Sequence, residues 1–193
     1  MRFFKICVAC MSMVGLLNNA VAAGDKWFAS IYAGQYSDTA LNEIVRFNTR
    51  TESSYVYVLS LGKELGVFKD KIGMELEGQV GWHSGLQSHN EINMSFTLRW
   101  LPFYWDRYLD TSFAFGNGVS YASDAPELEI RESDDDETNQ WLYYILVEMA
   151  FVVPNYEQCD IFLRIHHRSS VFGAIEGIVA GSNFVGAGVR YRF

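Results

Sequence analysis

The sequence predicts an all-β fold, an eight-stranded antiparallel transmembrane β-barrel of the bacterial outer membrane. Three observations support this prediction: an N-terminal segment typical of an export signal, apolar residues at every second position over long stretches, and a last strand that ends on an aromatic residue. Hydrophobic residues make up 49% of the 193 residues and charged residues 20%. This composition excludes an intrinsically disordered chain, which would be poor in aromatic residues and rich in charge.

The first 22 residues are expected to be a cleaved signal peptide. Arg2 and Lys5 precede an apolar run over residues 6–17, and Ala20–Ala22 supplies the small-residue pattern of a cleavage site. The alternative, an uncleaved signal anchor, needs about 20 apolar residues, more than this run provides. The mature chain would then be a single barrel over residues 23–193.

Alternation with a period of two is clearest over residues 91–101. One face carries Ile92, Met94, Phe96, Leu98 and Trp100, and the other carries Glu91, Asn93, Ser95, Thr97 and Arg99. Residues 74–82 and 112–121 alternate in the same way. Successive side chains of a strand point to opposite faces, so these segments are expected to be strands with one apolar face.

A soluble β-sandwich also alternates, so the period alone does not separate the two folds. The polar faces here carry full charges and small residues, as a barrel lumen does, whereas the apolar faces carry large aromatic residues near strand ends. Residues 183–193 form a last alternating strand that closes on Phe193. This ending resembles the assembly signal of bacterial outer-membrane barrels.

Eight strands are expected, near residues 27–37, 54–62, 73–83, 91–101, 111–122, 140–153, 159–171 and 183–193. The turns at 63–72, 102–110 and 154–158 would then lie on the periplasmic side, together with both ends of the barrel. The first two strands are the least regular, because residues 27–36 and 55–61 are apolar on both faces.

An eight-stranded barrel is only wide enough to be filled by side chains, which excludes a general diffusion pore. Inward charges must then pair, and the hairpin near residue 156 sets Glu148 opposite Arg164. We therefore predict an ion pair between them, in preference to a catalytic role for Glu148. The inward set is expected to be Arg164, His166, Arg168, Arg190 and Arg192.

The external loop over residues 122–140 is strongly acidic. It is expected to be a solvated loop; a divalent-cation site is the alternative, but its spacing does not match a calcium-binding loop. The whole chain carries a net charge of −8, which argues against a nucleic-acid partner. Cys159 is the only cysteine beyond the signal, which excludes an intramolecular disulfide and a thiolate metal cluster.

The seventh strand carries the sharpest functional signal. Its charged face includes Arg164, His166 and Arg168, so its apolar face should meet lipid, and His167 and Ser169 share that apolar face. Residues i and i+2 of a strand lie roughly 6.5–7 Å apart at Cα, which lets an imidazole reach a serine hydroxyl. A polar pair that faces hydrocarbon is by default a functional hypothesis; the alternative is a His and a Ser at headgroup level.

The segment 162–170, with the final strand ending Arg190–Phe193, resembles the PagL family of outer-membrane lipid A 3-O-deacylases. The resemblance implies a serine esterase that removes an ester-linked 3-hydroxyacyl chain from lipid A of lipopolysaccharide. It assigns Ser169 as the nucleophile, His167 as the base and Glu176 as the orienting acid. This chain has Ser170 where better-known members have an Asn, and Glu176 lies closer to the serine than their acid does. Alternatively, no acid is needed, or one comes from the loop over residues 124–137.

The expected mechanism follows from general chemistry. The imidazole takes the serine proton, a carboxylate fixes its tautomer, and backbone N–H groups near Ser170–Gly173 stabilise the oxyanion. The expected partners are lipid A and outer-membrane lipids, with neither metal nor cofactor, and a homodimer remains open. Two other functions also remain open: a structural or adhesive barrel, and a barrel that binds lipid A without activity.

Overall fold

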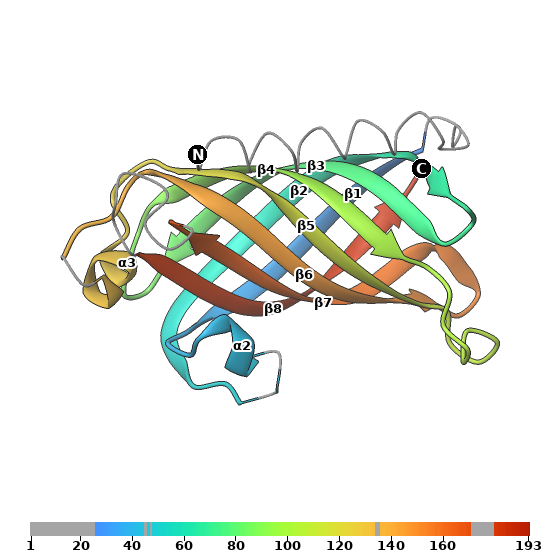
Figure 1. Ribbon diagram of the computed structural model, residues 1–193, viewed down its shortest axis with the longest axis horizontal. Coiled ribbons are helices and arrows are strands. Elements are labelled where there is room, and N and C mark those ends of the chain that lie inside the picture. The colour runs from blue at the N-terminus through green and yellow to red at the C-terminus, as the bar shows by residue number, and fades with distance from the viewer. Residues whose placement is uncertain (1–25, 45, 47, 134–135, 171–179) are drawn as a thin grey trace, which may run out of the picture.

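The computed structural model describes residues 26–44, 46, 48–133, 136–170 and 180–193. Eight antiparallel strands form a closed barrel in which each strand pairs with its neighbours in chain order and β8 pairs with β1 (Figure 1). The strands are β1 (Trp27–Ser37), β2 (Thr51–Phe68), β3 (Ile72–Ser84), β4 (Asn90–Trp100), β5 (Thr111–Ala122), β6 (Trp141–Val153), β7 (Tyr156–Ser169) and β8 (Gly181–Arg192). The predicted fold class is confirmed. The predicted signal peptide lies outside the described residues.

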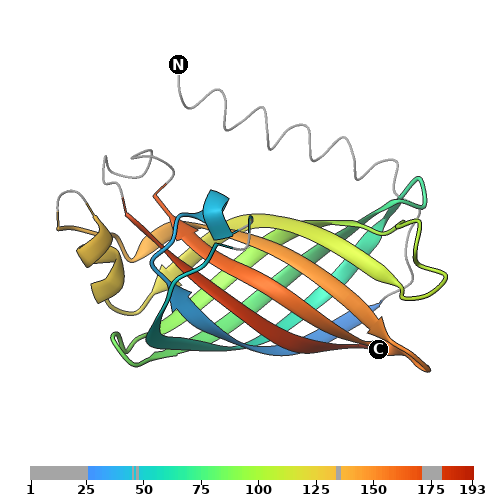
Figure 2. The ribbon, with the colours of Figure 1, turned by 90° about the horizontal axis from the view of Figure 1, so that it is seen from below.

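The two ends of the barrel differ. Backbone hydrogen bonds between Trp27 and Phe193, at 2.8 and 3.0 Å, bring the first and last strands together at one end, where the connections after β2, β4 and β6 also lie. We call this the turn end. The opposite end, the loop end, carries the short helices α2 (Leu41–Ile44) and α3 (Glu127–Glu132) (Figures 1 and 2). Among the described residues, neither helix has the length and apolar character needed to span a bilayer.

Two of the expected turns are tighter than predicted. β2 continues to Phe68, so the expected turn over 63–72 shrinks to three residues, of which Lys69 and Asp70 have positive φ. The expected turn over 154–158 shrinks to Pro154 and Asn155, again with positive φ at Asn155. Asp and Asn tolerate this conformation better than most residues, because their short side chains can hydrogen-bond locally.

The outer surface carries a belt of exposed large apolar side chains. Ile31, Leu59, Ile92, Met94, Leu163 and Val189 are each more than half exposed. Tryptophans lie at strand ends on the same surface, at Trp27, Trp82, Trp100 and Trp141. Soluble proteins rarely expose a continuous apolar patch of this size, so the belt marks the lipid-facing surface, with aromatic residues at its borders.

The lumen at mid-height is filled by a network of buried ion pairs. Glu148 accepts hydrogen bonds from Arg99 (2.8 Å), Arg164 (2.9 Å) and Arg190 (2.8 Å). Arg164 also donates to Glu77 at 2.9 Å. The predicted pair between Glu148 and Arg164 is confirmed, as is the inward direction of all five predicted residues, with Arg192 partly exposed at the turn end.

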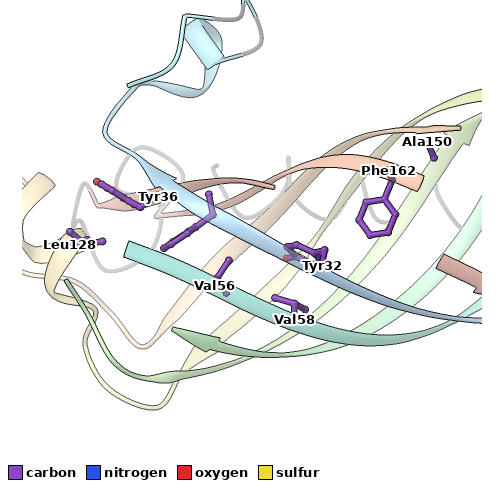
Figure 3. Packing of buried hydrophobic residues seen from close by; sticks show 8 residues of the cluster. Tyr32, Tyr36, Val56, Val58, Leu128, Ala150 and Phe162 are labelled. Atoms are coloured by element: carbon purple, nitrogen blue, oxygen red, sulfur yellow. The ribbon is translucent and has the colours of Figure 1, made fainter. Parts of the chain in front are cut away.

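The apolar residues on both faces of the first two strands also have a structural reason. The inward face of β1 and β2 carries aromatic and branched side chains that pack in the lumen against Phe162 and Phe184 from β7 and β8 (Figure 3). This cluster comprises Tyr32, Tyr36, Val56, Val58, Leu128, Ala150, Phe162 and Phe184. The Arg164 guanidinium lies 4.9 Å from the Phe162 ring centroid, so the aromatic cluster also faces the buried charges.

Candidate functional site on the outward face of β7

Strand β7 separates the two adjacent histidines by face. His166 is fully buried in the lumen, whereas His167 and Ser169 are partly exposed on the outward face, in line with Ile161 and Leu163. Ser169 is the last residue of β7, so the pair lies at the loop end of the strand. In barrels of this type the loop end is the outer side of the membrane. The structure therefore places His167 and Ser169 on the outward face of β7, near the loop end.

The orientation of the His167 ring is set by Asn183. Residues 167 and 183 are paired across β7 and β8, and His167 Nδ1 lies 2.7 Å from Asn183 Oδ1. Asn183 Nδ2 donates to the backbone carbonyl of Thr39 at 3.0 Å, which fixes the direction of the amide. The amide oxygen must then accept, so His167 carries its proton on Nδ1. Its lone pair is therefore on Nε2, the nitrogen a general base would use.

Sequence reasoning missed Asn183. It lies 14 residues after Ser169, across the loop that joins β7 and β8, and only the register of that hairpin shows that it faces His167. Its amide contacts the ring nitrogen of His167 that a carboxylate was expected to contact. Glu176 itself lies outside the described residues.

The expected source of oxyanion donors is partly corrected. Ser170 is buried on the lumen side; its backbone N–H donates to the Ala180 carbonyl at 3.0 Å, and its hydroxyl accepts from the Ala180 N–H at 3.0 Å. Both groups close the base of the β7–β8 hairpin, so the Ser170 N–H is already used. Residues 171–173 lie outside the described part of the chain.

His166 belongs to a different environment. Its Nε2 lies 2.7 Å from Glu91 Oε1, and its Nδ1 contacts the Tyr32 hydroxyl. The Tyr144 ring stands edge-on to the imidazole, with centroids 4.8 Å apart. These contacts enclose His166 within the lumen, away from the lipid-facing surface.

The comparisons with known proteins address the fold. The sequence matches no protein-family model and no curated protein. Among solved structures, the outer membrane enzyme PagL superposes with a TM-score of 0.56 at 9% identity, over 85% of this chain and 98% of PagL. Neisserial surface protein A superposes with a TM-score of 0.51 at 10% identity, over 89% of this chain and all of that protein. The fold is that of a bacterial outer-membrane barrel.

One residue of the acidic loop is buried in the lumen at the loop end. Glu129 of α3 is fully buried and accepts hydrogen bonds from Arg168 (2.6 Å), Ser182 (2.8 Å) and Thr138 (2.9 Å). The expectation of a solvated loop is therefore wrong at this position, because the buried Arg168 guanidinium requires a carboxylate partner. Because it is bound to Arg168 in the lumen, Glu129 cannot also orient His167 on the outer face.

A second cluster could hold a metal ion. His83, His89 and Glu91 are buried in the lumen near the loop end, with one ligand atom of each within 4.8 Å of the others. These three residues were not among the site residues predicted from the sequence. Burial lowers the pKa of His89, which lies in the loop between β3 and β4, to about 3 and keeps its imidazole neutral.

Proposed function

We propose that this barrel is an outer-membrane serine esterase that removes an ester-linked 3-hydroxyacyl chain from lipid A. The observation that carries the proposal is the arrangement of His167. A histidine on the lipid-facing surface is oriented through Nδ1 by Asn183, and its strand neighbour on the same face is Ser169. A purely structural barrel has no need for an oriented imidazole at this depth.

The proposed reaction uses the serine as a nucleophile. His167 Nε2 accepts the proton of the Ser169 hydroxyl while the oxygen attacks the ester carbonyl. The resulting imidazolium then protonates the sugar oxygen as its bond to the acyl carbon breaks, which releases the sugar as an alcohol. Water, activated by the same imidazole, then hydrolyses the acyl-serine. Asn183 acts as a positioning residue: its Oδ1 holds the tautomer, as the Asn of the Cys-His-Asn proteases does.

The substrate class follows from the position of the pair. An ester carbonyl can reach an outward-facing serine laterally through the bilayer, and the acyl chain stays in hydrocarbon beside exposed side chains such as Leu163. The loop end would meet the outer leaflet, where lipid A is the abundant acylated lipid. The shared fold with the outer membrane enzyme PagL is consistent with this proposal.

The alternative is a structural or adhesive barrel, and the fold shared with a Neisserial surface protein favours it. A barrel that binds lipid A without hydrolysing it is a third reading, suggested by Ser170 and by the short spacing from Ser169 to Glu176.

Mass spectrometry of lipid A from cells that express the protein separates these readings. The proposal predicts loss of one 3-hydroxyacyl chain with the wild-type protein and an unmodified profile with Ser169→Ala, at equal amounts of folded barrel in the outer membrane. Ser170→Ala is a matched control, because this serine faces the lumen, and it should retain most of the activity. An unmodified profile with folded wild-type protein would rule out the esterase under these conditions and favour the alternatives.

A further inference from the structure

The mouth of the β3–β4 hairpin brings two histidines face to face. His83 and His89 flank the loop, and the backbone N–H of His83 donates to the backbone carbonyl of His89 at 2.9 Å. Their imidazole rings stack with centroids 4.1 Å apart. Glu91 lies two residues beyond His89, so strand alternation places it on the same lumen face, and its Oε2 lies 2.8 Å from His83 Nε2.

His89 is the unexplained member of this group. The residue is 6% exposed, and neither of its ring nitrogens has a hydrogen-bond partner among the described residues. Buried polar groups are nearly always paired, and an unpaired one costs free energy. By contrast, His83 and His166 are both bonded to Glu91. Stacking on His83 covers the face of the His89 ring but leaves its nitrogens unsatisfied.

We propose that His83, His89 and Glu91 form a binding site for a late first-row divalent metal ion such as Zn²⁺. Two imidazoles and one carboxylate are a ligand set that such ions prefer, and water would complete a four-coordinate site. This proposal is independent of the proposed esterase, because the cluster lies in the lumen and His167 and Ser169 lie on the outer surface.

Metal binding requires the three ligand atoms to draw together and the two stacked rings to separate. Ligand atoms of a tetrahedral zinc site lie about 3.4 Å apart, given bonds of about 2.1 Å. The three ligand atoms here lie within 4.8 Å of one another, so the widest pair must close by at most roughly 1.4 Å. The His89 ring must turn out of its stack on His83, because an imidazole binds a metal in its own ring plane and the two planes are only 14° apart. No hydrogen bond restrains this rotation.

Gln87 provides the second-shell contact. At present its Nε2 donates to His83 Nδ1 at 3.2 Å, and its Oε1 accepts from the Leu128 N–H over a long 3.4 Å. Metal binding at His83 Nε2 moves the imidazole proton to Nδ1, and the Gln87 amide then turns its oxygen toward the ring to accept it. Histidines that bind metals usually donate their second N–H in this way.

Calorimetric titration with Zn²⁺ tests the site. The full-length mature barrel, refolded in detergent without a histidine tag, should bind one equivalent, and His89→Ala should weaken binding at least 100-fold. His167→Ala is the matched control, because it removes another of the four histidines from the outer surface, and it should bind as tightly as the wild type. A heat-modifiable gel shift confirms that each variant is folded.

A spectroscopic measurement on the wild type keeps the test independent of the variants. Cu²⁺ bound at the site should show nitrogen hyperfine coupling from two imidazoles by electron paramagnetic resonance. Absence of stoichiometric Zn²⁺ binding by the folded wild type, coupling from fewer than two imidazoles, or wild-type affinity in folded His89→Ala would overturn the proposal.

Discussion

The two faces of β7 lie in different surroundings, one in the packed lumen and the other on the lipid-facing surface. On the lumen face, Arg164 and Arg168 are fully buried and each is held by buried carboxylates, Glu77 and Glu148 for the first and Glu129 for the second. On the outer face, one residue away, His167 has a side-chain hydrogen bond to an amide, that of Asn183. The two arginines are therefore held in place by burial and by their ion pairs, whereas His167 lies on the surface that borders lipid.

The two faces are therefore expected to serve different ends, the lumen face the stability of the barrel and the outer face the proposed hydrolysis. Removing a lumen charge leaves its partner buried and uncompensated, which is expensive. Removing an outward polar side chain leaves the lumen packing intact. We therefore predict that substitutions on the inner face affect unfolding and that substitutions on the outer face affect hydrolysis.

The largest expected effect is on hydrolysis. Ser169→Ala and His167→Ala should each lower kcat for lipid A deacylation by about 10⁴-fold or more, and the double variant should lose little further, because nucleophile and base act as a unit. Steady-state kinetics on the purified barrel measures this. Additive losses would show that the two side chains do not act in one step.

The next effect is on stability. Glu148→Gln should destabilise the barrel by about 3–5 kcal/mol, because Arg99, Arg164 and Arg190 lose a shared buried carboxylate. Urea unfolding measures the change, and Glu127→Gln, at an exposed position of α3, is the matched control and should behave like the wild type. An unchanged midpoint for Glu148→Gln would contradict a structural role for the network.

A smaller loss is expected at the positioning residue. Asn183→Ala should lower kcat by about 10- to 100-fold, because the His167 tautomer is no longer fixed, while KM changes little. Asn183→Asp should restore activity and move the acidic limb of the pH profile to higher pH, since a carboxylate stabilises the imidazolium. If the pH profile does not move, Asn183 serves only the packing of the hairpin.

The smallest loss among the site residues is expected at Glu176. Because Asn183 already contacts His167 Nδ1, Glu176→Ala should reduce kcat by less than Asn183→Ala does. Measuring both variants side by side decides which residue orients the base. A greater loss for Glu176→Ala would return that role to the carboxylate.

The sequence predicts the regular strands well, and the reason is local. β1 and β5 are found at their predicted bounds, and β4 and β6 lie within one residue of theirs. Strict alternation accounts for β4 and β5, because it identifies strands wherever the two faces meet different solvents, whereas β1 and β6 are largely apolar on both faces. β2 is longer than predicted: its lumen face is apolar around Val56 and Val58, and its register shifts between Glu64 and Gly66. The alternation of residues along one strand predicts neither the extra length of β2 nor its register shift.

Only those features of the site that depend on a single strand could be predicted from the sequence. Alternation along β7 separates His166 from His167, and the structure agrees. The contact with Asn183 and the burial of Glu129 depend on how the loops at the loop end return to the barrel, which no periodicity encodes. His83 and His89 could have been paired from the sequence, because they flank a short hairpin loop and share a face with Glu91.

The most direct test of the central claim compares His166→Ala with His167→Ala in the same cells, with lipid A acylation read by mass spectrometry. The account predicts that His167→Ala abolishes loss of the 3-hydroxyacyl chain, whereas His166→Ala, with its side chain in the lumen, retains substantial activity. If His166 proves essential and His167 dispensable, the outward-facing active site is contradicted.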